Sequence, residues 1–519
     1  MDTELGINKS GIVNYLFDFR DCLVKSKKSI LMYIIMIALV SFLLLGPDNY
    51  AHPKTELIVI GLLVILGIFS IVLHYKNGNE KLYVTAFVVI LIFGLVCCLV
   101  TPIISVSDEG EHLMRAEMTS RGVLFPDYVN GSYESISAMN FFAKSNDLTV
   151  LQVDGDTDKI NHTADHKTAA FEQNPFFGYM FSGLGIFFAK LLDLNVIWIL
   201  WLGRIFNALF YAITVSYAIK KTPIYKLPIF AIACLPVCLF QAYSVSVDCI
   251  VTGLGILAVA YFFNMCENKF TARDIIIVAC LSLFAGLCKL PYLGLALLLL
   301  FAPTKNFNED DKKRYYAYAV LGIILVLLIG VLWSKLVATP ALSHSWRAQY
   351  MIENNVNISN QLNYIICHPF ELFTGFFNYI SKSFNNIFSM FAFYSYSRGG
   401  EYVPSQFIST LNTLFFGLLC FGYPVDKKID LKSKIGALFT FIVVFVGICI
   451  TMLLSWSPVG QLTFAGIHTR YFLPLFALLP FVCGINISSV KGDSMDYPII
   501  TMTILFISAM IISLTALYY

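Results

Sequence analysis

Charged side chains are scarce in this sequence. Asp, Glu, Lys and Arg together make up 13% of its 519 residues, whereas 58% of the residues are hydrophobic and the mean hydropathy is +0.73. A soluble protein of this length needs more charge than this to cover its surface. The composition therefore excludes a set of soluble domains and predicts an all-α polytopic membrane protein.

Several functional motifs are also missing. There is no Gly-x-x-x-x-Gly-Lys phosphate loop and no serine nucleophile elbow, so nucleotide hydrolysis and serine hydrolase chemistry have no support. No basic patch accompanies the net charge of +2, and we therefore expect no nucleic-acid partner. The 13 cysteines fall mostly in apolar runs, which excludes the disulfide framework of a secreted domain.

No small-residue cleavage site follows the first apolar run, so we expect it to be a retained span.

Apolar runs follow one another along most of the chain. A helix needs about 20 apolar residues to cross a bilayer, and on that rule we predict about thirteen spans. They are expected near 29–46, 57–74, 83–103, 195–219, 226–243, 246–265, 274–288, 290–303, 315–337, 405–424, 433–455, 471–487 and 498–518.

Lys and Arg concentrate in every second connection between these spans, which predicts a cytoplasmic N-terminus. The alternation holds only if the apolar stretch 175–192 lies in the outer interface or re-enters the membrane without crossing it. It then places two large loops outside, about 104–194 and about 338–404, and we expect interfacial helices in both of them.

The stretch 101–122 is unusually rich in chemically active side chains. It follows directly on a predicted span and contains Asp108, Glu109, Glu111, His112 and Arg115. With Ser107 as an N-cap, a helix would place acid, imidazole and guanidinium groups on one face. One interpretation is a well-capped, solvated interfacial helix. The other is an active site, because a carboxylate at the outer end of a span can take a proton from a hydroxyl group beside a lipid headgroup.

Further charges lie at comparable positions in later segments. Asp248 falls at an outer turn between two apolar helices, where an ionisable group usually faces a cavity or a partner, or else caps a helix. Four cations could hold a phosphate, although each could equally be a snorkelling or salt-bridged residue. They are Arg204, Lys289, Arg347 and Arg470.

One pair of histidines has the spacing of metal ligands on a helix. His162 and His166 are four residues apart, with Asp165 between them. We favour a structural role for this pair and predict no set of metal ligands and no certain cofactor, although a divalent metal is compatible with the acid pair in the first loop.

The segment 102–122 resembles the signature of a bacterial membrane family, domain of unknown function 2142. The matching core is Ser-Asp-Glu-Gly-Glu-His-Leu-Met-Arg-Ala, and Asn174-Pro175 with Tyr179, then Arg204, Ser246-Val-Asp248, Lys289-Leu-Pro-Tyr292 and Arg470-Tyr-Phe-Leu-Pro474 follow in the family's order. The resemblance covers roughly residues 80–485. It departs from the usual pattern in Ser107, where a proline often stands, and in two extra N-terminal helices.

That family is grouped with the C-type (GT-C) glycosyltransferases, and the resemblance implies a GT-C-like fold. The domains would be 1–82 with the two extra spans, 83–487 with the catalytic transmembrane domain and both outer loops, and 488–519 with the last span. By resemblance, Asp108 is the general base and Glu109 orients substrate or metal. Glu111, His112, Arg115 and Asp248 support them, and Lys289, Arg204, Arg470 and Arg347 are candidates for the donor phosphate.

The predicted function is transfer of one sugar at the outer face of a bacterial plasma membrane. The resemblance implies an inverting enzyme with a polyprenyl-phosphate sugar donor, and a cell-surface glycan, teichoic-type polymer or lipid-linked molecule as acceptor, with membrane lipid around it. A phosphate leaving group needs charge stabilisation more than an acid, which suits one acid cluster with several cations. Two alternatives stay open: a transporter or flippase for a lipid-linked or polyanionic substrate, and a glycan polymerase or ligase.

Overall fold

The structure is a computed structural model. It describes residues 20–45, 53–129, 131–168, 171, 173–304, 307–385, 394–396, 400–402, 405–424, 429–464, 466–484 and 493–519. It is mostly helical and confirms the predicted all-α polytopic class. Among the described residues, eight helices are long and apolar enough to cross a membrane. They are α2 (Lys27–Leu45), α3 (Pro53–Asn77), α4 (Leu82–Val100), α8 (Ile197–Lys221), α11 (Val247–Glu267), α13 (Glu309–Trp333), α20 (Leu431–Trp456) and α23 (Asp493–Tyr518).

The predicted count of about thirteen spans is not reproduced, because the other predicted segments are short or interrupted. Pro236 begins a new helix and splits 226–243 in two, since proline cannot continue a helical hydrogen-bond ladder. Within the predicted span 290–303, Leu290–Leu300 forms a 3-10 helix, and prolines interrupt 471–487. These elements are α9 (Lys226–Ala233), α10 (Pro236–Ala242), α12 (Ala272–Cys288), η2 (Leu290–Leu300), α19 (Gln406–Phe421), η4 (Thr469–Phe472), α21 (Leu473–Phe476) and α22 (Leu479–Cys483).

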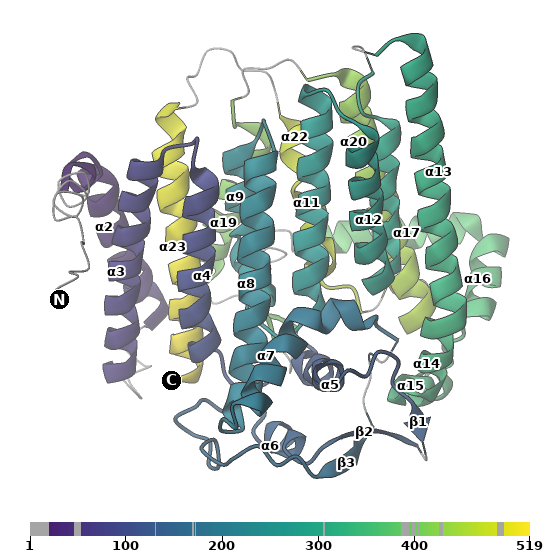
Figure 1. The fold of residues 1–519 in the computed structure, drawn as a ribbon, viewed down its shortest axis with the longest axis horizontal. Coiled ribbons are helices and arrows are strands. Elements are labelled where there is room, and N and C mark those ends of the chain that lie inside the picture. Colours follow the sequence, from purple (N-terminus) through teal and green to yellow (C-terminus); the bar gives the residue numbers. More distant parts are fainter. Residues whose placement is uncertain are drawn as a thin grey trace, which may run out of the picture.

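The long helices stand side by side, and the first of the two loops that we predicted to lie outside covers one end of the bundle (Figure 1). The N-terminal helices α2 and α3 pack against the C-terminal α23, α4 packs on α8, and α8 packs on α11. The loop contains α5 (Glu109–Ser120), α6 (Met139–Lys144), η1 (Phe176–Tyr179), α7 (Met180–Leu191) and an antiparallel sheet in the order β1 (Tyr128–Val129), β2 (Ser132–Ile136) and β3 (Ala164–Lys167).

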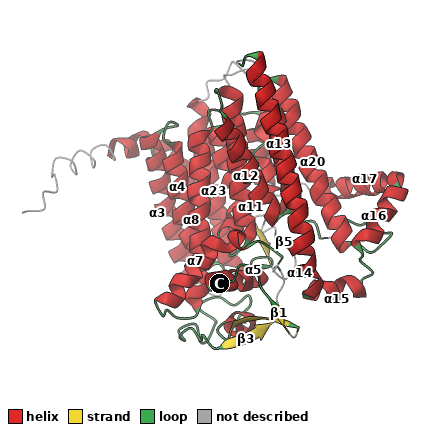
Figure 2. Cartoon of the chain, turned by 45° about the vertical axis from the view of Figure 1, so that its right-hand side comes forward, coloured by secondary structure: helices red, strands yellow, loops and turns green. Residues whose placement is uncertain are grey.

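The second long loop, which we predicted to lie outside, is near the same end of the bundle. Its helices α15, α16 and α17 extend to the side of α13 and α20 in the turned view (Figure 2). The described elements are η3 (Ser334–Ala338), α14 (Thr339–His344), α15 (Trp346–Glu353), α16 (Ile358–Cys367), α17 (Pro369–Asn385), and a hairpin of β4 (Tyr394–Tyr396) and β5 (Gly400–Tyr402).

The basic connections meet at the opposite end of the bundle. The turns from α8 to α9, from α11 to α12 and from η2 to α13 lie at the upper end in Figure 1, away from α5. The helical part of the stretch 175–192 runs from Phe176 to Leu191, which is shorter than a span, and packs against α5 and α8. The two ends therefore differ in charge as expected, and the sidedness of the membrane stays a prediction.

Candidate active site

Asp108 stands at the start of α5 in an unusual backbone conformation. Its φ is +62°, in the left-handed region, and α5 begins at Glu109. Ser107 is therefore not the N-cap that we predicted; Asp108 occupies that position and makes no capping hydrogen bond with its side chain. Asp and Asn tolerate the left-handed region better than other residues with a side chain. The carboxylate pairs with Arg470 instead of capping the helix.

The carboxylates near this helix start differ sharply in exposure. The side chain of Asp108 is 43% exposed, whereas those of Glu109 and Asp248 are 0% and 3% exposed. Of these three acids, only Asp108 is open to a substrate.

Glu109 is enclosed in an ion pair with Arg204. The guanidinium donates to both carboxylate oxygens, from Nε at 2.8 Å and from Nη2 at 2.6 Å, and the Val245 N–H donates to the same carboxylate at 3.0 Å. Arg204 also donates to the backbone carbonyls of Thr101 and Pro102, both at 2.8 Å. This pair ties α5 and the end of α4 to α8.

Asp108 belongs to a chain of alternating charges. Arg470 in η4 pairs with Asp108, and its Nε lies 3.7 Å from Asp248 Oδ2. Asp248 in turn pairs with Lys289, which follows the last residue of α12. The ring of Tyr471 lies beneath both cations, with Lys289 Nζ 4.3 Å from its centroid. The structure thus brings together four residues that lie far apart in the sequence.

The environment keeps Asp108 ionised. Burial by itself would raise the pKa of Asp108, but Arg470 and then His112 outweigh it and lower that pKa below its ordinary value. The pKa of His112 falls to about 4, chiefly because the ring is buried. The pKa of His468 also falls to about 4, through burial and then the charge of Arg470. Asp108 is therefore ionised at neutral pH, and the imidazoles of His112 and His468 are neutral.

Arg347 is the cation without an acid. Its guanidinium stacks 4.2 Å from the ring centroid of Trp456 and donates a long hydrogen bond of 3.4 Å to the Ser455 carbonyl. Its Nε is enclosed without a partner, and across the described ranges it makes no ion pair. Burial lowers the pKa of Arg347, and the nearby Tyr471, Tyr350 and Asp108 oppose that shift.

Two of the remaining predicted residues have other surroundings. Arg115 donates to the carbonyls of Asn174 and Leu124, at 3.3 and 2.9 Å, and so holds two loop segments against α5. Glu111 lies half-buried on the same helix. Sequence reasoning missed Tyr471 and Trp456 as partners of the cations, although Tyr471 is adjacent to Arg470 in the motif that we singled out.

The comparisons with known proteins bear on this arrangement. The family model described as "Predicted membrane protein (DUF2142)" matches residues 91–479. The chain belongs to the DUF2142 family. No curated protein matches it. Among solved structures, the crystal structure of ArnT from Cupriavidus metallidurans bound to undecaprenyl phosphate is similar over 83% of this chain and 78% of that chain, at 14% identity and a TM-score of 0.32.

Family membership confirms the predicted resemblance, and this DUF2142 chain is a multi-pass membrane protein. The matched range includes Asp108, Glu109, Arg204, Asp248, Lys289, Arg347 and Arg470.

The histidine pair does not have the helical geometry that its spacing indicated. Ala164–Lys167 is a strand, and Asp165 accepts a hydrogen bond from Asn140 at 2.8 Å and pairs with Lys167. Within the part of the DUF2142 chain that the structure describes, no three His, Cys, Asp or Glu side chains could together hold a metal ion.

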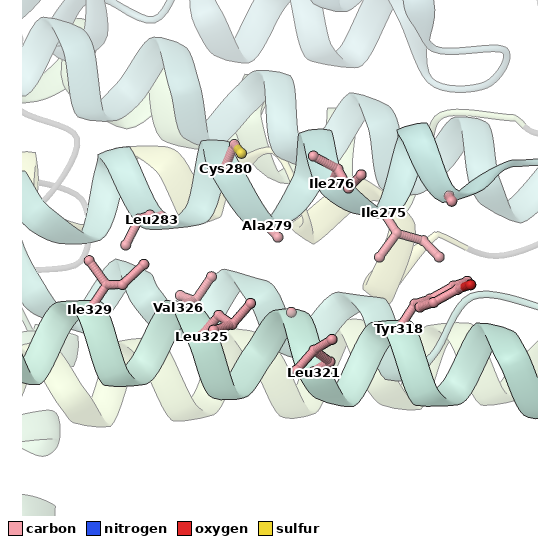
Figure 3. Close-up of a pocket in the computed structure, with 12 residues that line it drawn as sticks. Ile275, Ile276, Ala279, Cys280, Leu283, Tyr318, Leu321, Leu325, Val326 and Ile329 are labelled. Atoms are coloured by element: carbon pink, nitrogen blue, oxygen red, sulfur yellow. The ribbon is translucent and has the colours of Figure 1, made fainter.

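An apolar groove of about 470 Å³ lies between α12 and α13. Side chains of the two helices, among them Leu283 and Ile329, face each other across it in Figure 3. Its lining contains no charged residue, so the groove is separate from the ionic cluster and offers no group for acid, base or phosphate chemistry.

Proposed function

We propose that this DUF2142 protein is an inverting GT-C-type glycosyltransferase. It moves a sugar from a polyprenyl-phosphate donor to a cell-surface glycan, teichoic-type polymer or lipid-linked acceptor at the outer face of the bacterial plasma membrane. The observation that carries the proposal is the exposed carboxylate of Asp108 within a cluster of buried acids and of buried or half-buried cations. An accessible, ionised acid beside several cations suits a reaction that removes a proton and releases an anion.

The reaction needs one base and one anion site. The acceptor hydroxyl attacks the anomeric carbon and the bond from that carbon to the phosphate oxygen breaks, so the configuration inverts. Asp108 takes the hydroxyl proton, and the polyprenyl phosphate leaves with the bonding electrons. A phosphate is a weak base, so its departure depends on charge stabilisation rather than on a general acid.

Among the residues that the structure describes, more cations than acids lie in the ionic cluster around Asp108. Lys289 and Arg470 pair with Asp248 and Asp108, and Arg347 is close enough to Asp108 to be influenced by its charge, so among the described residues of this cluster three cations stand against two acids. An excess positive charge favours an anionic ligand, and guanidinium groups bind phosphate in a bidentate manner. We assign Arg347 as the principal phosphate contact, because the other two cations already have carboxylate partners.

The buried pair is assigned a supporting role. Glu109 and Arg204 are both completely enclosed, so neither can touch a substrate without a rearrangement of the fold. We propose that they set the position of the α5 start, and therefore of Asp108, and that Arg204 does not bind the donor phosphate.

The decisive experiment compares Asp108→Asn with a matched control in cells. Asn tolerates the left-handed region, so the variant is expected to fold and insert normally. Asp147→Asn is the control, because Asp147 has the same φ of +62° in the same loop but lies outside the ionic cluster. Mass spectrometry of released surface polysaccharide is expected to show one sugar substituent lost in Asp108→Asn and retained in Asp147→Asn.

Two other results would contradict the assignment. An unchanged glycan with Asp108→Asn at normal abundance in the membrane would remove Asp108 as the base. Accumulation of a lipid-linked precursor with the glycan backbone absent would favour transport or polymerisation instead, and Asp108 would then act on substrate passage.

A further inference from the structure

Tyr179 connects the first outer loop to His112 through a buried hydrogen-bond chain. Its side chain is fully buried at the end of η1. Its hydroxyl lies 2.7 Å from His112 Nδ1 and receives a hydrogen bond from the Asn174 side-chain amide at 2.8 Å. The proposed reaction does not use the hydrogen bonds among His112, Tyr179 and Asn174.

The direction of the hydrogen bonds determines where the imidazole proton sits. Asn174 donates its N–H to the Tyr179 oxygen, and the hydroxyl has a single hydrogen of its own. The other partner of this hydroxyl among the described residues is His112 Nδ1, and the buried hydroxyl satisfies its own hydrogen there only by donating to that nitrogen. Nδ1 then accepts, and in a neutral ring the proton must be on Nε2.

The His112 ring lies within electrostatic reach of the ionic cluster. Phe171 stacks on the imidazole, with centroids 4.5 Å apart and planes at 16°, and so limits rotation of the ring. His112 makes no second hydrogen bond to a described residue, and the residue is 4% exposed. The charges acting on this ring are Asp248, Asp108, Arg470 and Lys289.

We propose that Tyr179 and Asn174 are positioning residues that hold His112 as its neutral Nε2–H tautomer, so that His112 donates a hydrogen bond to a substrate oxygen beside Asp108. The presence of a substrate oxygen at this place rests on the proposed function, whereas the hydrogen bonds among Asn174, Tyr179 and His112 do not depend on it. A neutral donor is suited to this place, because it binds an oxygen without adding charge to the cluster or pairing with the base. Burial keeps the pKa of His112 at about 4, in agreement with a neutral ring at physiological pH.

The test is nitrogen NMR of the purified full-length protein with ¹⁵N-labelled histidine side chains. His112→Gln identifies the signals of His112 by their loss. The wild-type protein is expected to show an unprotonated, hydrogen-bonded Nδ1 and a protonated Nε2 between about pH 8 and pH 5. A protonated Nδ1 in that range would overturn the proposal.

Asn174→Asp provides a second test, because it should reverse the direction of the hydrogen bond between Tyr179 and His112. A carboxylate at this position can only accept, so the Tyr179 hydroxyl would donate to it and accept from His112 instead. The proton is then expected to move from Nε2 to Nδ1. Tyr179→Phe is expected to abolish the hydrogen-bonded state of Nδ1. A His112 spectrum that neither variant changes would also overturn the proposal.

Tyr211→Phe is the matched control. It removes another fully buried hydroxyl, which donates to the Ala233 carbonyl at 2.9 Å, and it is expected to leave the His112 signals unchanged. In the transfer assay, Asn174→Asp and Tyr179→Phe are expected to lose about two- to tenfold in rate, the value of one hydrogen bond.

The two proposals fail in different ways. If Asp108→Asn retains transfer while the tautomer shifts appear as described, the glycosyltransferase assignment fails and the role of Tyr179 stands. If transfer depends on Asp108 but the His112 signals contradict the expected tautomer, only the positioning role is lost.

Discussion

Glu109→Gln should destabilise the folded protein rather than stop its chemistry alone. The Glu109 carboxylate accepts hydrogen bonds from Arg204 Nε, Arg204 Nη2 and the Val245 N–H, at 2.8, 2.6 and 3.0 Å, and both charged side chains are 0% exposed. A glutamine would leave the guanidinium charge buried without compensation and would point an amide N–H at it. Removing one partner of such a pair costs about 3–5 kcal/mol.

A double-mutant cycle separates the charge from the other contacts. Arg204→Met leaves Glu109 uncompensated and also removes donors from the carbonyls of Cys98, Thr101 and Pro102, at 3.2, 2.8 and 2.8 Å. In the combined variant no buried charge remains, and only the lost hydrogen bonds count, at about 1 kcal/mol each. We therefore expect the double variant to be more stable than the sum of the two single effects by about 2–3 kcal/mol.

The assay is thermal unfolding of the purified proteins in one detergent, followed by tryptophan fluorescence, together with sugar transfer at a temperature where all variants are folded. Asp108→Asn is the comparison and is expected to unfold like the wild-type protein. A Glu109→Gln protein as stable as wild type but inactive would refute the reasoning, because it would make Glu109 a participant in the reaction. If the destabilisations by Glu109→Gln and Arg204→Met simply add up in the double variant, the direct pairing of Glu109 with Arg204 would be refuted.

Other consequences of the structure are testable by simpler means. The transfer rate should stay constant as the pH falls from neutral and decline only below the ordinary aspartate pKa of about 3.9, because the pKa of Asp108 is lowered and the ionised form is the active one. Arg470→Gln removes the main cause of that lowering, so whatever rate it retains should decline at a higher pH; a pH profile with an unchanged acid limb would contradict this. Gly185→Ala would place a Cβ 2.2 Å from the Leu202 carbonyl oxygen, whereas nothing lies within 4 Å of a Cβ at Gly61. Gly185→Ala should therefore lower the unfolding free energy by about 1–3 kcal/mol, and Gly61→Ala should leave it unchanged or raise it by up to about 1 kcal/mol; equal melting temperatures would argue against the close contact of α7 and α8.

Hydropathy alone predicted the class of the protein and the position of most long helices. A bilayer-spanning helix is encoded by a run of neighbouring apolar residues, so it can be recognised locally. The count of about thirteen is not confirmed where prolines interrupt apolar runs, as at Pro236, or where the run forms a 3-10 helix, as in Leu290–Leu300. In those places the run is as apolar as in a continuous helix, and the backbone geometry decides whether one long α-helix forms.

The charged residues of the candidate site were also visible in the sequence, because ionisable groups stand out against an apolar background. Their pairing was not visible. Glu109 pairs with Arg204, 95 positions away, and Asp108 pairs with Arg470, 362 positions away. Only the tertiary structure decided that Glu109 is enclosed while its neighbour Asp108 is open, since exposure depends on which distant helices pack against each side chain. The sequence alone therefore shows which acids are present, and only the fold decides which of them is exposed and which is enclosed.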